Sequence, residues 1–277
     1  TEPSLLPLAG SEEANEWRGY IPFDELPRLY NPPSGCIATA NNKIADSAYP
    51  YYLSNFFEPP QRIRRINQLL QSQERFSAED MAKLQLDQLS LHAIELIQTL
   101  TADLRAIPGD ERLVHDAVAR LLAWDGDCAA ESVPAAIFHV FHQRLLANLL
   151  GDELGDELYR AYTEILNQCI VPTDKIFCDE RSCWFAKRPR KALVAQSLRE
   201  ACTELRQSFG AKSDRWHWGK LHRLSLNHAL GRVALLKPAI SIGPMPVGGD
   251  GMTVNLGFYR HATPYAQTVG AALRYVI

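Results

Sequence analysis

The sequence has 277 residues, of which 46% are hydrophobic and 22% charged, and its formal net charge is −3. This is the composition of a globular protein, and without a long basic run it argues against a nucleic-acid-binding surface. No apolar stretch reaches the roughly 18–20 residues needed to cross a bilayer, since prolines and a lysine interrupt the longest, Val233–Val247. The sequence begins at Thr1 without a charged-then-apolar leader, so we expect any targeting segment to be absent or removed.

The first sixty residues, Thr1–Pro60, are rich in Pro, Gly, Asn and Tyr and contain short apolar bursts such as Cys36–Ala40. This texture predicts short strands and ordered loops instead of helices.

Apolar residues at helical spacing dominate the next part of the chain, up to Phe209. A helix is predicted around Ile63–Leu70. A second begins after Ser77, a suitable N-cap, and its apolar face continues to Leu100. Further helices are predicted at Glu111–Trp124, after Pro134, at Glu153–Ile170 and at Arg190–Phe209, where Gly210 provides a stop.

Strand and turn patterns return in the last part, Ala211–Ile277. Met252–Leu256 alternates apolar and polar residues as a half-buried strand does, and Val269–Ile277 is predicted as a final strand. The sequence therefore predicts an α+β fold. We expect residues 1–60 and 211–277 to form one strand-rich body, with Cys36–Ala40 pairing with Met252–Leu256, and residues 61–210 to form a helical insertion.

Few residues suggest chemistry by themselves. His139 and His142 lie one helical turn apart beside phenylalanines, with no acidic residue in the next turn, so helix packing is favoured over metal binding. His217 and His222 lie among tryptophans, which favours an aromatic cluster with backbone hydrogen bonds over general bases. Asp125–Asp127 lacks the later spacing of a calcium loop and predicts a helix-ending turn.

Six cysteines are scattered along the chain, which is not the pattern of a disulfide scaffold. Cys178 and Cys183 are close enough for a local disulfide. They would bind a metal only with further ligands, for which Asp179 and Glu180 are the candidates nearby, so free thiols or a disulfide are favoured.

Longer motifs carry a more specific signal. Residues 16–27 read EWRGYIPFDELP, residues 30–42 read YNPPSGCIATANN, and Tyr49-Pro50 follows; WHWGKLH at 216–222, GGDGMTVN at 248–255 and GAALRYVI at 270–277 come later in the same order. These stretches resemble the penicillin acylase family of N-terminal-nucleophile hydrolases. The resemblance implies a piece of the large subunit within an αββα sandwich.

The resemblance also implies how the family's reaction works. A precursor is cut to expose a serine whose own α-amino group acts as the base, an assignment consistent with the usual α-amino pKa of about 7.7–8.0. That serine would lie upstream of this chain, so we expect the chain alone to be inactive. The remainder of the precursor is its implied partner, and the implied location is periplasmic or secreted.

Two site residues are carried over by the resemblance. Asn41 matches the asparagine whose amide helps to form the oxyanion hole, and Arg62 matches an arginine that lines the site. Calcium is typical of the family, but the expected aspartate would follow Tyr49-Pro50, where this sequence has Tyr51 and Tyr52. No metal site is therefore predicted here.

The resemblance predicts an amidohydrolase for linear amides of N-acyl compounds, either β-lactam side chains or acyl-homoserine lactones. The alternative is a non-catalytic helical module that binds a partner, because the helical segment needs no active site to explain it. A serine preceded by a processing linker upstream of Thr1 would distinguish the enzyme from the module.

Overall fold

A computed structural model describes residues 7–16, 19–164, 169–233, 235 and 237–277. The motif residues Trp17 and Arg18 and part of the predicted helix Glu153–Ile170 lie outside these ranges. The helices are α1 Gln61–Leu70, α2 Ala78–Gln85, α3 Leu91–Arg105, α4 Arg112–Ala123, α5 Val133–Thr163, α6 Ile170–Cys178, α7 Arg190–Phe209, α8 Trp218–Leu221 and α9 Lys237–Ile240. The strands are β1 Arg223–Leu226, β2 Ile242–Pro246, β3 Gly257–Phe258 and β4 Val269–Gly270.

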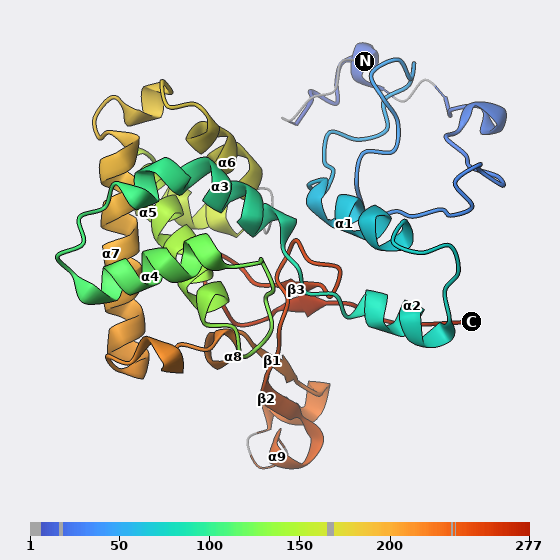
Figure 1. The fold of residues 1–277 in the computed structure, drawn as a ribbon. Coiled ribbons are helices and arrows are strands. Elements are labelled where there is room, and N and C mark those ends of the chain that lie inside the picture. Colours follow the sequence, from blue (N-terminus) through green and yellow to red (C-terminus); the bar gives the residue numbers. More distant parts are fainter. Residues whose placement is uncertain (1–6, 17–18, 165–168, 234, 236) are drawn as a thin grey trace.

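Helix α5 is the centre of a helical body, with α3, α4 and α7 around it (Figure 1). Its start is fixed by Ser132, whose hydroxyl accepts a hydrogen bond from the Ala135 amide at 3.3 Å, and by Pro134 in the first turn. The helix continues to Thr163, interrupted at Gly155, which has a positive φ of 68°. The sequence pattern predicts two helices over this stretch, and the kink at Gly155, whose φ and ψ are not helical, divides α5 into two helical parts as predicted.

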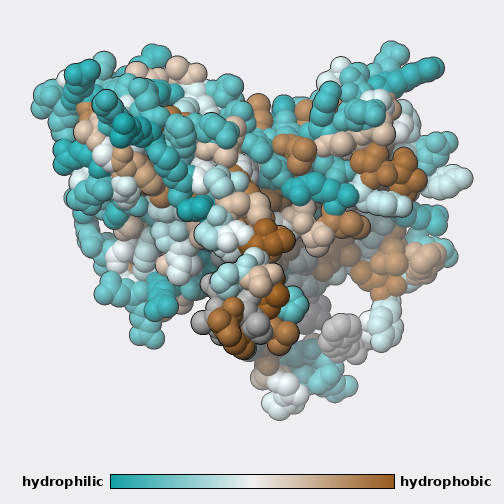
Figure 2. Space-filling view, turned by 90° about the horizontal axis from the view of Figure 1, so that it is seen from below, coloured by the Kyte–Doolittle hydropathy of each residue, from teal (hydrophilic) through white to brown (hydrophobic). Residues whose placement is uncertain are grey.

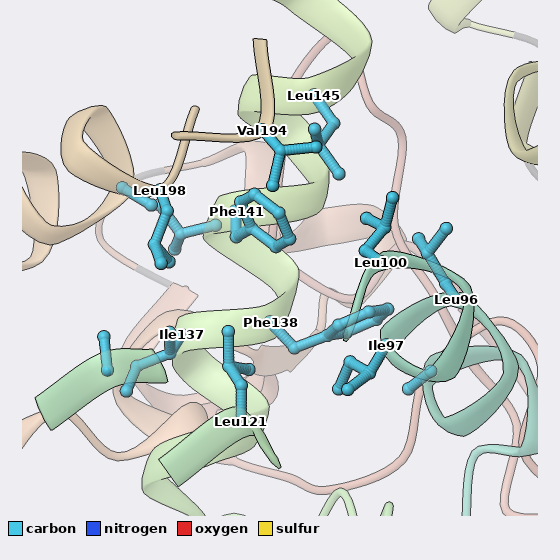
Figure 3. Close-up of a cluster of buried hydrophobic side chains, with 14 of the residues drawn as sticks. Leu96, Ile97, Leu100, Leu121, Ile137, Phe138, Phe141, Leu145, Val194 and Leu198 are labelled. Atoms are coloured by element: carbon cyan, nitrogen blue, oxygen red, sulfur yellow. The ribbon is translucent and has the colours of Figure 1, made fainter. Parts of the chain in front are cut away.

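The hydrophobic core lies where these helices meet. Figure 3 shows Phe138 and Phe141 of α5 between side chains from α3, α4 and α7, including Leu100, Leu121 and Leu198. These side chains are completely buried. Full burial of large apolar groups from four helices is what holds the helical body together.

Removing the α5 cap gives a direct test of how the helix begins. We expect Ser132→Ala to lower the free energy of unfolding by about 1 kcal/mol, because the Ala135 amide loses its acceptor. Ser132→Gly should cost less, since glycine is tolerated at N-caps. Urea unfolding checks this, with the exposed Ser208→Ala as a matched control; equal stabilities of the Ser132→Ala and wild-type chains would contradict the cap's role.

The predicted helix that follows Ser77 is two helices in the structure. Ser77 caps α2 as expected, but the chain leaves helical geometry between Leu86 and Ser90. There Gln88 and Ser90 hydrogen-bond to the backbone of Cys128 and Gly126, so this stretch pairs with a distant loop instead of with itself. The sequence pattern was wrong at this point because apolar spacing continues across the break.

The strands predicted at Cys36–Ala40 and Met252–Leu256 are absent, which corrects the predicted pairing between them. Local side-chain hydrogen bonds replace the ladder in both places. The Ala40 amide donates to Asn42 Oδ1 at 3.0 Å, and the Met252 amide donates to Asp250 Oδ1 at 2.6 Å. The final strand is also shorter than predicted, with only Val269 and Gly270 paired to β3.

The strands that do form make two small antiparallel sheets, β1–β2 and β3–β4. Together with the helices they are compatible with an α+β fold. In the lower part of Figure 1, β1 and β2 project from the helical body as a hairpin that carries α9. Figure 2 shows hydrophobic residues gathered on this hairpin, where Leu226, Leu235 and Ile242 are exposed.

Residues 7–16 and 19–60 form loops and 3-10 turns with no strand, and they lie to one side of the helical body together with α1 (Figure 1). Within these ranges Ala40 and Pro59 alone are buried. Large apolar side chains face solvent, with Tyr20 and Tyr30 exposed by 92% and 94% and Phe23 by 80%. This segment carries the most specific sequence motifs yet has almost no packed interior of its own.

Candidate functional site

Asn41 and Arg62, the two site residues predicted from the sequence, are in direct contact. Asn41 lies in a turn with a positive φ of 59°, a conformation that asparagine tolerates better than most residues. Arg62 lies in the first turn of α1 and donates from one guanidinium nitrogen to Ala40 O at 2.8 Å and to Asn41 Oδ1 at 2.9 Å. The structure thus brings together two residues that are 21 positions apart.

This contact fixes which end of the Asn41 amide is free. Oδ1 accepts from Arg62, and the backbone carbonyl of Asn41 accepts from the Glu58 amide at 2.9 Å. Among the described residues, no hydrogen bond from the side-chain Nδ2 is found. An exposed, oriented N–H₂ group is available to donate to a ligand oxygen.

Arg62 is half-buried, and burial lowers the pKa of its guanidinium while the nearby Glu58 opposes the shift. The group remains charged at neutral pH because an arginine pKa lies so far above 7. A charged guanidinium on Oδ1 polarises the amide and makes its N–H₂ group a stronger donor.

Tyr51 and Tyr52 occupy the position where the family resemblance would place a calcium-binding aspartate. The Tyr51 hydroxyl donates to Glu25 Oε2 at 2.6 Å, and the Tyr52 hydroxyl accepts from the Asn55 amide at 2.9 Å. Two phenols in place of a carboxylate do not match the oxygen-rich ligand set that calcium prefers.

A second polar cluster lies inside the helical body. Asp174 of α6 bridges two histidines, with Oδ2 at 2.6 Å from His92 Nε2 of α3 and Oδ1 at 3.4 Å from His142 Nε2 of α5. Burial alone would lower the pKa of His92, but the Asp174 carboxylate raises it above its usual value. Burial likewise opposes the change at Asp174, yet the two histidines hold its pKa well below the usual range.

The sequence pattern does not reveal this cluster. His142 is predicted to serve helix packing because no acidic residue follows in the next turn, but its acidic partner comes from α6, 32 residues away. His92 was not singled out. No sequence signal marks these residues, since their proximity depends on how α3, α5 and α6 pack.

His139, also on α5, packs as an aromatic residue. Its ring stacks on Trp218 with centroids 4.1 Å apart, and Nδ1 lies 3.1 Å from the Tyr259 hydroxyl. Burial and the neighbouring histidines lower its pKa well below the usual value.

His222 stacks on Trp218 at 4.7 Å, and its Nδ1 donates to the Tyr265 carbonyl at 2.7 Å. Burial lowers its pKa. His217 bonds to the Asp214 carbonyl at 2.9 Å. The predicted aromatic cluster with a backbone bond is confirmed for His222, whereas for His217 only the backbone bond is found in the described part of the chain.

Asp250, in the GGDGMTVN motif, connects the helical body to the C-terminal segment. Its buried carboxylate accepts from the Ser90 hydroxyl at 2.8 Å and from the Met252 amide at 2.6 Å. Cys128 Sγ lies 3.8 Å from the same carboxylate. Since Ser90 also caps α3, the motif anchors the start of that helix.

The six cysteines are all free thiols in the structure, including the exposed Cys178 and Cys183. The sequence favours either free thiols or a local disulfide for Cys178 and Cys183, and in the structure both are free thiols. None of the helices in the described part of the chain is long and apolar enough to cross a membrane.

Comparison with known proteins agrees with the resemblance that the sequence motifs suggest. Residues 1–277 match the family described as penicillin amidase. The chain is 32% identical to an acyl-homoserine lactone acylase, QuiP, of Pseudomonas fluorescens, with 99% of this chain and 35% of the relative covered. It is 31% identical to penicillin acylase 2 proenzyme of a Pseudomonas species, again with 99% and 35% covered. The chain thus spans about a third of the length of the curated relatives it matches, and it belongs to the penicillin amidase family.

Proposed function

We propose that the complete protein containing this chain is an acylase that hydrolyses linear amide bonds of N-acyl compounds. Family membership supports the reaction class. The relatives' names, acyl-homoserine lactone acylase and penicillin acylase, suggest acyl-homoserine lactones or β-lactam side chains as substrates. In this proposal the chain is part of a precursor-derived large subunit, and its partner is the remainder of that precursor.

The observation that carries the proposal is the contact between Arg62 and Asn41. With Oδ1 held by the guanidinium at 2.9 Å, the Asn41 N–H₂ group is oriented before substrate arrives. Donors of this kind lower the barrier of acyl transfer because they need no reorganisation when charge develops on the carbonyl oxygen. Arg62 then acts as a positioning residue for Asn41.

The proposed steps require a nucleophile that this chain does not supply. An N-terminal serine elsewhere in the protein attacks the acyl carbonyl, and its α-amino group takes the proton. Asn41 stabilises the oxyanion, the amine leaves, and water then releases the acid from the acyl-enzyme. None of the buried histidines takes part.

The proposal extends to architecture and location. Residues 1–60 and 211–277 would join the αββα sandwich of the whole enzyme, and residues 61–210 would form the helical insertion beside it. The exposed apolar side chains of the first segment support this, since they are the surface that a larger body would cover. We propose a periplasmic or secreted location from the family resemblance alone.

A paired activity measurement tests the function. We expect the complete protein to hydrolyse a phenylacetyl amide or an N-acyl homoserine lactone, and the isolated chain to hydrolyse neither. The reason is that the chain supplies one oxyanion donor and no nucleophile. If the complete protein hydrolyses neither substrate class, the proposed function is wrong. If the repurified chain alone turns over substrate, the claim that it lacks the nucleophile is wrong.

A further inference from the structure

Three helices meet at a compact set of metal-binding side chains that the proposed reaction does not use. His92 on α3, His142 on α5 and Asp174 on α6 each offer one ligand atom, and these atoms lie within 4.8 Å of one another. Both histidines are buried, and the Asp174 side chain retains 21% exposure. The ligands are therefore held rigidly on helices while one of them keeps a route to solvent.

The cluster borders a small, partly open pocket of about 20 Å³. His92, His142 and His261 line it, together with Ile170 and Met252. A cavity of this size has room for about one water molecule. A cation bound by the three side chains would thus have room beside it for a water molecule as a further ligand.

Two ligand–ligand distances can be compared with those of a tetrahedral site, and each runs to a different oxygen of Asp174. Zinc binds histidine nitrogen at about 2.0–2.1 Å, which places neighbouring ligand atoms about 3.3 Å apart. His142 Nε2 and Asp174 Oδ1 are already 3.4 Å apart. His92 Nε2 and Asp174 Oδ2 are 2.6 Å apart, so this pair would open by about 0.7 Å as the metal replaces their hydrogen bond.

We propose that His92, His142 and Asp174 form a binding site for a first-row divalent cation, with Zn²⁺ as the best match. Two imidazoles and one carboxylate suit zinc, whereas calcium takes six to eight oxygen ligands. The ion cross-links α3, α5 and α6 and replaces the hydrogen bonds that Asp174 makes to the two histidines. Its role is structural, and it stabilises the helical body by an amount that grows with the logarithm of the ratio of free ion concentration to Kd.

The test is metal binding by the complete, untagged protein after chelation and dialysis. We expect calorimetric titration with Zn²⁺ to give one site per chain, and Co²⁺ to develop the visible absorption of a tetrahedral site. Asp174→Asn and His142→Gln should each weaken binding by more than the 10–100-fold typical of losing an outer-shell partner. Asp156→Asn and His115→Gln, at exposed positions, should leave it unchanged.

Two results would overturn the site: no saturable Zn²⁺ binding by the wild-type protein, or unchanged binding in both ligand variants. The second would place the ion elsewhere, for example at the exposed thiols of Cys178 and Cys183. If a ligand variant fails to fold, anomalous scattering at the zinc edge from wild-type crystals decides the question by the presence or absence of a peak between the three side chains. None of these readouts depends on acylase activity.

Discussion

Replacing Asn41 with alanine in the complete enzyme should lower kcat by about 10²–10³, with a smaller effect on KM. The substitution removes the side-chain N–H₂ group of Asn41. Arg62 orients that group by donating a hydrogen bond of 2.9 Å to Asn41 Oδ1. Such a donor contributes mainly in the transition state, because its hydrogen bond strengthens only as negative charge develops on the substrate oxygen. Steady-state kinetics on the preferred acyl substrate measures both constants.

Two further variants separate the lost donor from a disturbed turn. Asn41 has a left-handed backbone, which alanine adopts at a cost and glycine adopts freely. Asn41→Gly therefore keeps the turn and should lose as much kcat as Asn41→Ala. Asn67→Ala, at an exposed position of α1, is the matched control and should retain wild-type rates. Wild-type kcat in Asn41→Gly would show that Asn41 is a turn residue only.

Acidification should destabilise the helical body strongly between about pH 6.5 and pH 4. His139, His222 and His261 have lowered pKa values because burial disfavours their charged forms, and that of His261 falls to about 3. Below the ordinary histidine value of about 6.5 the unfolded chain binds protons that the native chain does not. Each such histidine removes about 1.4 kcal/mol of unfolding free energy per pH unit, until the pH falls to its native pKa.

The pair formed by His92 and Asp174 has a different pH dependence. The raised pKa of His92 contributes stability that is present below about pH 6.5 and lost as the pH rises through the raised value. The lowered pKa of Asp174 contributes stability that is present above about pH 3.9 and lost at more acidic pH. The acid destabilisation above pH 4 is therefore assigned to the neutral histidines.

Urea unfolding at several pH values with chelator present measures the slope, and one variant assigns it. His222→Asn places an amide where Nδ1 donates to the Tyr265 carbonyl, and it should reduce the slope just below pH 6.5, because burial lowers the pKa of the His222 ring in the native state. Asn67→Ala, at an exposed position of α1, removes no titrating group and should not change it. A slope independent of His222 would mean that this ring is charged in the native state.

The helices were predictable because their signals are local. Arg190–Phe209 was predicted to the residue, with Gly210 as its stop, and the helix after Pro134 begins at the expected place. The strands were not predictable, because alternation at Met252–Leu256 is indistinguishable in sequence from a turn. Only the structure shows that the Met252 amide donates its hydrogen bond to the Asp250 side chain. That amide is therefore not available to pair with a neighbouring strand.

The candidate site residues likewise fall into those that the sequence could identify and those that only the structure reveals. Asn41 and Arg62 were identified by resemblance, and the structure adds the hydrogen bond that links them; their catalytic role stays a prediction. The cluster of His92, His142 and Asp174 could not be inferred, because its members come from separate helices and no fixed spacing relates them. Packing, not sequence order, creates that site.

The solvent-facing aromatic side chains between Tyr20 and Tyr30 imply an order of assembly. The helical body has a close-packed core to which Trp216, Trp218 and Tyr259 also contribute, so we expect it to fold with the C-terminal part as one cooperative unit. The first segment, with Ala40 and Pro59 as its buried residues in the described ranges, cannot reach its final packing until a covering surface arrives. On the proposed function, the oxyanion donor is thus completed last, which delays activity until the subunits have come together.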